Sequence, residues 1–433
     1  MKAKNSIWLI WLCWLVYTCS YIGKVNYAAN INQVMAFYNV DHSAAGLVST
    51  FFFFAYGVGQ IVHGLLCKKY NIKWVVLASL TISAMVNLIV GITTNFTLIK
   101  FLWMLNGFAM SVLWPCLIRL LSETLAKKEM SRATLVMGTT VGIGTFFVYA
   151  TSAAFVRINF RFSFYTATAV FVVVAILWVL FSSLLIKKAS EEGEREDALS
   201  NAGAVAASNS FNKSLILLSI VVLCFYGVAT NLIKDGLTTW VPSILKEEYK
   251  LDDSLSIILT LALPIVAIFG NAFAVSINKK IPDYVLQCAV TFFCAGLITV
   301  GIIFGMQSQQ LVLTLIGFVV VCLLASSCNS VITSIFPLYM KGKVNSGRIA
   351  GILNGFCYVG STISSYGLGW IADNHGWLPV FWVLCAVCGV VCVGAGIYLA
   401  LRKKLKESKK EKHRVESLQG EKEGKEDEAL SRT

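Results

Sequence analysis

The chain alternates long apolar stretches with short polar or charged segments. Each apolar stretch is close to or longer than the ~20 residues that a helix needs to cross the hydrocarbon core of a bilayer. The pattern therefore predicts an all-α membrane protein with twelve transmembrane helices, whose approximate bounds are 6–36, 44–67, 73–94, 98–122, 132–156, 163–186, 213–245, 254–277, 283–305, 311–338, 347–371 and 378–401.

Two polar segments divide the chain and end it. Residues 187–212 are first acidic and then rich in Ala, Ser and Asn, and residues 402–433 mix Lys, Arg and Glu without apolar periodicity. We therefore predict an N-terminal six-helix bundle over 1–186, a cytoplasmic linker over 187–212, a C-terminal six-helix bundle over 213–401 and a charged cytoplasmic tail over 402–433.

Short matches at an offset of about 210 residues relate the two predicted bundles. Asn106-Gly107-Phe108 recurs as Ile316-Gly317-Phe318, and Lys24 inside the first span recurs as Lys234 inside the seventh. Each match is weak alone, but their common order indicates a duplicated chain. Parallel repeats of six spans build one large class of transporters, which bind substrate between the repeats.

Composition and charge agree with this pattern. Of 433 residues, 57% are hydrophobic and 14% are charged, a balance typical of polytopic membrane proteins. The net charge of +13 could suggest a nucleic-acid partner, but most of the 36 lysines and arginines fall in alternate loops and at the termini. This positive-inside bias predicts a multi-pass protein of the plasma membrane with both termini cytoplasmic. The basic surface would then face anionic lipid, with no nucleic-acid partner.

The sequence has no recognisable catalytic or cofactor motif. It contains no phosphate loop, no nucleophile triad and no clustered metal ligands, which are the signatures of pumps, hydrolases and metalloenzymes. Thirteen cysteines are scattered mostly through apolar spans, so they predict small buried side chains rather than disulfides. We expect neither an enzyme nor a bound cofactor or metal, and we expect a monomer.

Lys24 lies unusually deep in the first span. Tyr17, Tyr21 and Lys24 are spaced i, i+4, i+7 and share one helix face. A lysine in a bilayer costs at least ~2.5 kcal/mol even on the mildest scale. The side chain could snorkel to the surface, but about 17 helical residues, or ~25 Å, separate Lys24 from Ile7. The position therefore favours a lysine that faces a water-filled cavity.

The seventh span repeats this arrangement. Tyr226, Thr230, Lys234 and Thr238 are spaced by four on one face. Spans ten and eleven carry hydroxyl and amide side chains that could line the same cavity or form hydrogen bonds between helices. These are Ser326, Ser327, Asn329, Ser330, Asn354, Tyr358, Ser361 and Thr362.

Two further ionisable residues could couple transport to protons. Asp235 follows Lys234 directly, so the two do not share a helix face. Asp235 could be a proton-coupling acid, a counter-charge for Lys24 or a structural partner of a neighbouring helix. His63 in the second span could relay a proton or contact a ligand, although an interhelical hydrogen bond explains it more simply.

Other polar residues have local explanations. Asp41 and Asp252 precede spans two and eight, and we interpret them as helix N-caps. Arg119 and Glu123 are spaced i, i+4 near a helix end, where they could form a gate contact or a plain local ion pair.

Two segments resemble a known family. Residues 234–247, which read Lys-Asp-Gly-Leu-Thr-Thr-Trp-Val-Pro-Ser-Ile-Leu-Lys-Glu, are similar to the signature of the organophosphate:phosphate antiporters of the major facilitator superfamily. That family includes glycerol-3-phosphate and hexose-phosphate transporters, in which an arginine occupies the place of Lys234. Residues 21–27, which read Tyr-Ile-Gly-Lys-Val-Asn-Tyr, resemble the family's first-span motif, again with lysine for arginine.

The resemblance implies a fold and a binding site. The fold would be two pseudo-symmetric six-helix bundles, and Lys24 and Lys234 would bind the substrate phosphate. Tyr17 and Tyr21 match the family's first-span tyrosines, whereas Gln60 and Thr139 stand where glycerol-3-phosphate carriers have a basic residue and a histidine. The predicted substrate-binding set is completed by Tyr56, Asn231 and Tyr358.

The implied function is secondary active transport of a small organic anion, as a phosphate ester exchanged for inorganic phosphate. Lysines bind anions as point charges and lack the bidentate fork of arginine, which leaves other anionic substrates open. A proton- or sodium-coupled carboxylate symporter is one alternative. A membrane sensor of hexose phosphate is another, because the resemblance extends to such sensors.

Overall fold

The structure is a computed structural model that describes residues 4–66, 69–200, 213–340 and 346–430. Every regular element in these ranges is helical. The first half contains α1 (Lys4–Ala29), α2 (Ile31–Tyr38), α3 (His42–Leu66), α4 (Ile72–Ile92), α5 (Phe96–Ser111), α6 (Leu113–Thr124), α7 (Lys127–Met137), α8 (Thr140–Phe155) and α9 (Arg161–Ser200).

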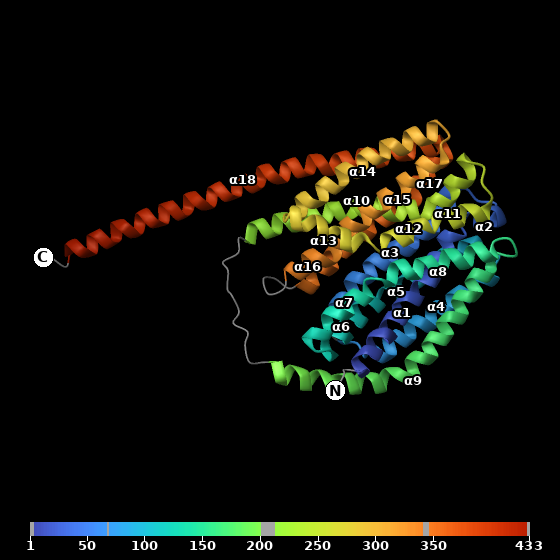
Figure 1. The fold of residues 1–433 in the computed structure, drawn as a ribbon, viewed down its shortest axis with the longest axis horizontal. Helices are drawn as coiled ribbons and strands as arrows, with labels where there is room; N and C mark the ends of the chain where they lie inside the picture. Colours follow the sequence, from blue (N-terminus) through green and yellow to red (C-terminus); the bar gives the residue numbers. More distant parts are fainter. Residues whose placement is uncertain (1–3, 67–68, 201–212, 341–345, 431–433) are drawn as a thin grey trace.

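The described part of the second half is also built of helices. It contains α10 (Lys213–Glu248), α11 (Asp253–Thr260), α12 (Ala262–Ala267), α13 (Gly270–Lys280), α14 (Tyr284–Gln307), α15 (Leu311–Ser330), the π-helix η2 (Val331–Ile335), α16 (Phe336–Tyr339), α17 (Ser346–His375) and α18 (Trp377–Leu430). Figure 1 shows the two halves as two groups of helices packed side by side.

Each of the twelve predicted spans corresponds to a helix or to a run of short helices. Ten are long and apolar enough to cross a membrane, and the pair Asp253–Ala267 and Gly270–Lys280, bent by 42°, makes an eleventh. The remaining predicted span, 347–371, is helix α17. Its serines, glycines and asparagine lower its hydropathy, and one side of this helix packs against α3 and α10.

The helix bundle has two ends, a near end and a far end. The near end is where α1 and α10 begin and α3 stops, around Asn5, Leu66 and Ser214. The far end holds α2 and the turns around Arg157 and Asp252. Helix α1 begins at the near end, and α18 extends beyond it (Figure 1).

Two helices extend past the predicted spans. Helix α9 continues to Ser200, so the acidic first part of the predicted linker is helical, whereas 201–212 lies outside the described residues. Helix α18 continues to Leu430, so the predicted charged tail is a helix that projects away from the bundle (Figure 1).

Glycines let helices approach closely at the centre. A Cβ placed on Gly46 of α3 would lie 2.0 Å from the carbonyl oxygen of Ser365 on α17, which belongs to the other half. A Cβ placed on Gly360 of α17 would lie 2.0 Å from the carbonyl oxygen of Val228 on α10. Because backbone atoms cannot yield as a flexible side chain can, these contacts fix the position of α17 against α3 and α10.

Replacing Gly360 with alanine should therefore destabilise the protein. We expect a loss of ~1–3 kcal/mol, as for other overpacked sites, seen as a lower melting temperature in detergent. Gly351→Ala on the same helix is the matched control, because no atom of the described residues lies within 4 Å of a Cβ there. Equal melting temperatures for the two variants would contradict this account of the packing.

Candidate functional site

Lys24 and Lys234 occupy matching places in the two halves. Lys24 lies 20 residues after the start of α1 and 14 before the end of α2. Lys234 lies 21 residues after the start of α10 and 14 before its end. The structure thus places one partly exposed lysine near the middle of each half, as the sequence pattern predicts.

Lys24 is surrounded by aromatic rings from both halves. Its Nζ lies 4.2 Å from the ring centroid of Tyr56 and 5.0 Å from that of Tyr21. It also donates a hydrogen bond of 3.3 Å to the hydroxyl of Tyr358, which comes from α17 in the other half. Within the part of the chain that the structure describes, no carboxylate forms an ion pair with Lys24. Ring quadrupoles and one hydroxyl therefore stabilise its charge.

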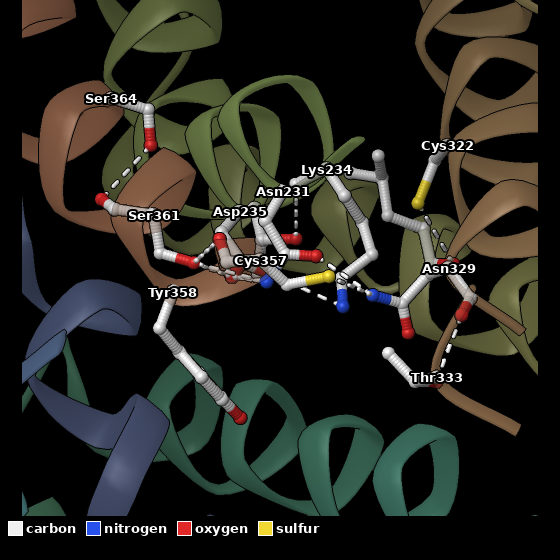
Figure 2. Close-up of polar contacts among 12 residues, drawn as sticks. Asn231, Lys234, Asp235, Cys322, Asn329, Thr333, Cys357, Tyr358, Ser361 and Ser364 are labelled. Atoms are coloured by element: carbon white, nitrogen blue, oxygen red, sulfur yellow. Dashed lines mark hydrogen bonds and ion pairs between the residues drawn. The ribbon is translucent and has the colours of Figure 1, made fainter. Parts of the chain in front are cut away.

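Lys234 contacts a carboxylate. Its Nζ lies 3.4 Å from Oδ1 of Asp235. The other carboxylate oxygen, Oδ2, accepts a hydrogen bond of 3.1 Å from Nδ2 of Asn231 and a second from the hydroxyl of Ser361. Oδ1 of Asn231 in turn accepts a 2.8 Å hydrogen bond from Asn329 of α15 (Figure 2). This network holds Asp235 in place independently of Lys234.

Helix α17 contacts both Lys24 and the carboxylate partner of Lys234. Tyr358 contacts Lys24, and Ser361, three residues later on the same helix, contacts Asp235. We call Lys24, Lys234 and Asp235, with Tyr358, the two-lysine cluster. The side chains of Lys234 and Asp235 remain 22% and 16% exposed despite their mid-span position, so protein atoms do not cover them completely. With two ammonium groups and one carboxylate, the cluster has a net positive charge and can bind an anion.

The contact between Lys234 and Asp235 differs from the sequence expectation. Adjacent residues on a helix point about 100° apart, which led us to place these two on different faces. The four-carbon stem of lysine bends far enough to bring its Nζ to the neighbouring carboxylate. Asp235 also contacts α17, so the structural-partner alternative for this residue describes part of its role.

Three of the predicted binding residues contact residues other than those of the two-lysine cluster. Tyr17 is buried beside Tyr21, with ring centroids 5.6 Å apart. Gln60 crosses to the second half, where its Oε1 accepts a 3.3 Å hydrogen bond from Asn354. The hydroxyl of Thr139 instead accepts a hydrogen bond of 2.9 Å from the indole of Trp14 at the break between α7 and α8.

His63 also lies apart from the two-lysine cluster. It is in the last turn of α3, where its Nδ1 is 3.0 Å from the hydroxyl of Tyr70 and its ring packs on Phe108 of α5. These contacts fit the simpler, interhelical explanation of this histidine. Arg119 and Glu123 form the local ion pair, at 2.8 Å.

A second cluster, which the sequence did not reveal, closes the far end. The two ring nitrogens of His42, in α3, lie 2.6 Å from Asp373 of α17 and 2.7 Å from Glu247 of α10. The ring packs between Trp240 and Trp377, with centroids 5.6 Å and 5.2 Å away. A carboxylate only accepts hydrogen bonds, so both nitrogens must donate, which requires the charged imidazolium.

The start of α3, beside His42, is capped by two carboxylates. The sequence predicts Asp41, the neighbour of His42, as a helix cap, and Asp41 does cap α3, because its Oδ1 accepts a 2.7 Å hydrogen bond from the amide of Ala44. Asp373 also caps this helix, through the amides of His42 and Ser43. The available signal was a single histidine at a span start together with carboxylates at the ends of spans seven and eleven.

Two further contacts join the halves at the far end. The hydroxyl of Ser243 donates a 2.6 Å hydrogen bond to Asn32, and both residues are buried. Arg157 and Asp252 form an exposed ion pair at 2.9 Å. The hydrogen bond from Arg157 holds the pKa of Asp252 below its ordinary value. As predicted, Asp252 also caps α11, where it accepts a hydrogen bond from the amide of Leu255. The described structure is thus closed at the far end.

Comparison with known proteins agrees with this geometry. Residues 13–347 match the family model of the Major Facilitator Superfamily. Sugar phosphate exchanger 3 of Homo sapiens is 21% identical over 394 residues, which cover 80% of this chain and 78% of that protein. Membrane sensor protein UhpC of Escherichia coli is 22% identical over 392 residues, which cover 88% of each. A probable hexose phosphate transport protein of Chlamydia pneumoniae is 24% identical over 147 residues, 33% of this chain and 32% of that protein.

Solved structures share the fold. A bacterial homologue of the human lysosomal transporter Spinster, in an inward-facing and occupied conformation, has a TM-score of 0.68 at 11% identity and covers 91% of this chain and 96% of that one. The nucleoside transporter NupG has a TM-score of 0.67 at 12% identity and covers 92% and 99%. At such low identity these similarities concern the fold alone.

The far-end contacts predict that His42→Ala opens this end. The substitution removes the cation through which the first half holds Glu247 and Asp373, both of which belong to the second half, so this attraction across the far end is lost. Spin labels at Asn95 and Gln307, exposed at the far ends of the two halves, should then report a longer distance. Raising the pH of the parent protein should shift the distance in the same direction, because neutral imidazole cannot donate to both carboxylates.

Arg157→Ala is the control for this experiment. It also removes a contact between the halves, but an exposed ion pair contributes little, so the label distance should change little. An unchanged distance in His42→Ala, or an equal change in both variants, would contradict the role of His42.

Proposed function

Because the chain belongs to the Major Facilitator Superfamily, we propose that it is a secondary active transporter that exchanges a phosphate ester for inorganic phosphate. The observation that carries the proposal is the two-lysine cluster, with one mid-span lysine from each half. The names of two relatives, a sugar phosphate exchanger and a probable hexose phosphate transport protein, support this choice of substrate. The family assignment favours a transporter over an enzyme.

Alternating access follows from the position of the cluster. An anion bound to both Lys24 and Lys234 would attract the two halves toward each other across the cluster. Opening to either side would then require contacts at one end of the bundle to break while those at the other end form. The His42 cluster supplies such contacts at the far end. Every residue of both clusters comes from one chain, so a monomer suffices for this mechanism.

The orientation in the membrane is part of the proposal. Lysines at the near ends of described helices, such as Lys73, Lys188 and Lys279, support a cytoplasmic near end, by the positive-inside rule. We place the protein in the plasma membrane with both termini in the cytoplasm. In a background without native cysteines, a cysteine at Asn95 should react with an impermeant label applied to sealed cells, and one at Lys279 should not. The reverse labelling would refute this orientation.

Two other functions remain as alternatives. The similarity to a membrane sensor protein over 88% of each chain supports a sensor of hexose phosphate. A sensor would bind the phosphate ester but would not exchange it across proteoliposomes. The carboxyl–lysine contact at Asp235 would also suit a proton- or sodium-coupled carboxylate symporter. Counterflow with preloaded phosphate separates the exchanger from both alternatives, because only the exchanger is accelerated by internal phosphate.

Lys24→Ala and Lys234→Ala should each abolish exchange. A hydrogen bond to a charged group contributes ~1.5–3 kcal/mol, so binding of glucose 6-phosphate and inorganic phosphate should weaken by at least about tenfold. Lys24 has no carboxylate partner among the described residues, so Lys24→Ala should keep its stability, whereas Lys234→Ala leaves Asp235 without its cation. Binding is measured as a ligand-dependent rise in melting temperature, and exchange as counterflow.

Lys100→Ala is the control, because this lysine lies in α5 near the far end and contacts only the ring of Phe96 in the described contacts. Lys24→Arg and Lys234→Arg refine the test, since a phosphate should tolerate the guanidinium fork. Folded Lys24→Ala and Lys234→Ala proteins that exchange phosphate at the parental rate would refute the binding role of the lysines.

Asp235→Asn tests the role of the carboxylate. In the empty site Asp235 neutralises Lys234, so an incoming phosphate competes with it. The amide can still accept from Asn231 and Ser361 while it frees Lys234, so the affinity for inorganic phosphate should rise, by about tenfold for ~1.4 kcal/mol of competition. Asp41→Asn, a cap outside the cluster, should leave the affinity unchanged. A lower phosphate affinity in Asp235→Asn would show instead that Asp235 positions Lys234.

A further inference from the structure

A long apolar groove lies on the outer surface of the first half, between α4 and α9. These helices pack side by side along one edge of the molecule (Figure 1). The groove has a volume of about 430 Å³. Its lining is almost entirely apolar and includes Leu77, Ala84 and Leu88 of α4 and Val172, Ile176 and Leu180 of α9.

The lining side chains are open to the surroundings of the bundle. Ile176 and Leu180 are 53% and 63% exposed, and Met85 on the opposite wall is 57% exposed. Both helices are long and apolar enough to cross a membrane. In a bilayer the medium that surrounds such side chains is the hydrocarbon of lipid acyl chains.

At the near end the groove stops at basic side chains. Lys73 precedes Leu77 by four residues on α4, so both lie on the face that lines the groove. Its Nζ donates a 2.7 Å hydrogen bond to the hydroxyl of Ser183 on α9, which brings the charge across the end of the groove. Lys187 follows Ser183 by four residues and is exposed. Among the described residues, neither lysine forms an ion pair with a carboxylate.

One exposed tryptophan marks the same level as a membrane interface, and a second, buried tryptophan joins the two helices there. Trp74 is 61% exposed beside Lys73, whose Nζ lies 5.7 Å from its ring centroid. The indole of Trp178 donates a 3.0 Å hydrogen bond to the carbonyl oxygen of Lys73 and so ties α9 to the start of α4. Tryptophan is enriched where the headgroups of a bilayer lie.

We propose that this groove is a binding site for an anionic phospholipid. One acyl chain occupies the groove between α4 and α9, and the phosphate lies against Lys73 and Lys187. The charge of the two lysines complements an anionic headgroup, and their spacing along α4 and α9 puts them in line with the apolar walls. A zwitterionic lipid fits the groove equally well but places a second cation near the lysines, so it binds less tightly.

The site adjoins the first helix. Phe171, on the inner wall of the groove, fills the space that a side chain at Gly23 would need, because a Cβ there would lie 2.2 Å from its ring. Gly23 precedes Lys24. A lipid in this groove therefore packs against a side chain that supports α1 beside the two-lysine cluster.

Native mass spectrometry of the full-length protein tests the proposal. The protein is titrated with phosphatidylglycerol and phosphatidylcholine, and the bound lipids are counted. We expect one phosphatidylglycerol to be retained in preference to phosphatidylcholine. Lys73→Ala should reduce that preference by about fivefold, the effect expected of one lysine at a membrane surface. Ile176→Trp should fill the groove and reduce the binding of both lipids.

Matched variants control for unspecific effects. Lys279→Ala removes an exposed lysine at the near end of the other half, and Leu297→Trp adds an indole to a 58% exposed position on α14; both should leave the preferred lipid bound. Met85→Trp, on the opposite wall, replaces Ile176→Trp if that variant does not fold. The proposal is overturned if Lys73→Ala keeps the full preference for phosphatidylglycerol, or if both groove-filling variants bind lipid as the parent does.

Discussion

The free-energy cost of holding two positive charges at the middle of a membrane protein governs the rest of this structure. Such charges persist only where neighbouring groups or water compensate for the lost hydration. The protein stabilises the charges of Lys24 and Lys234 in different ways. Aromatic rings and the hydroxyl of Tyr358 surround Lys24, whereas Asp235 neutralises Lys234. Because Tyr358 belongs to the second half and Lys24 to the first, even the empty site requires both halves to be in contact.

This difference would give the two lysines different parts in the proposed anion binding. Lys24 loses little when an anion arrives, since its hydroxyl and ring contacts are weaker than an ion pair. Lys234 must exchange one anionic partner for another, and Asn231 and Ser361 already hold the carboxylate that it would leave. Under the proposed function, a phosphate would therefore gain most of its attraction at Lys24 and meet competition at Lys234. The cluster favours ligands with enough negative charge to outcompete one carboxylate.

Much of this arrangement could be predicted from the sequence, because it depends on local patterns. Lys24 and Lys234 are conspicuous in apolar spans, and Asp252 and the pair of Arg119 and Glu123 follow helix-cap and i, i+4 rules. The far-end cluster could not be predicted in this way. His42 is separated from Glu247 by 205 residues and from Asp373 by 331, and only the tertiary fold brings them together. The position of Thr139 was equally hidden, since a helix break turns its hydroxyl toward Trp14.

The two clusters are connected through the helices that they share. Glu247 lies on α10 with Lys234 and Asp235, and Asp373 lies on α17 with Tyr358 and Ser361. Thirteen residues separate Lys234 from Glu247, or ~20 Å along a helix, and Pro242 is the proline within that segment. A shift of α10 or α17 toward an anion on Lys24 would therefore also move Glu247 or Asp373, which accept hydrogen bonds from His42. A bend of α10 at Pro242 would weaken this connection. The first half presents a single histidine to both acceptors, so a shift of either helix would act on the same far-end contact.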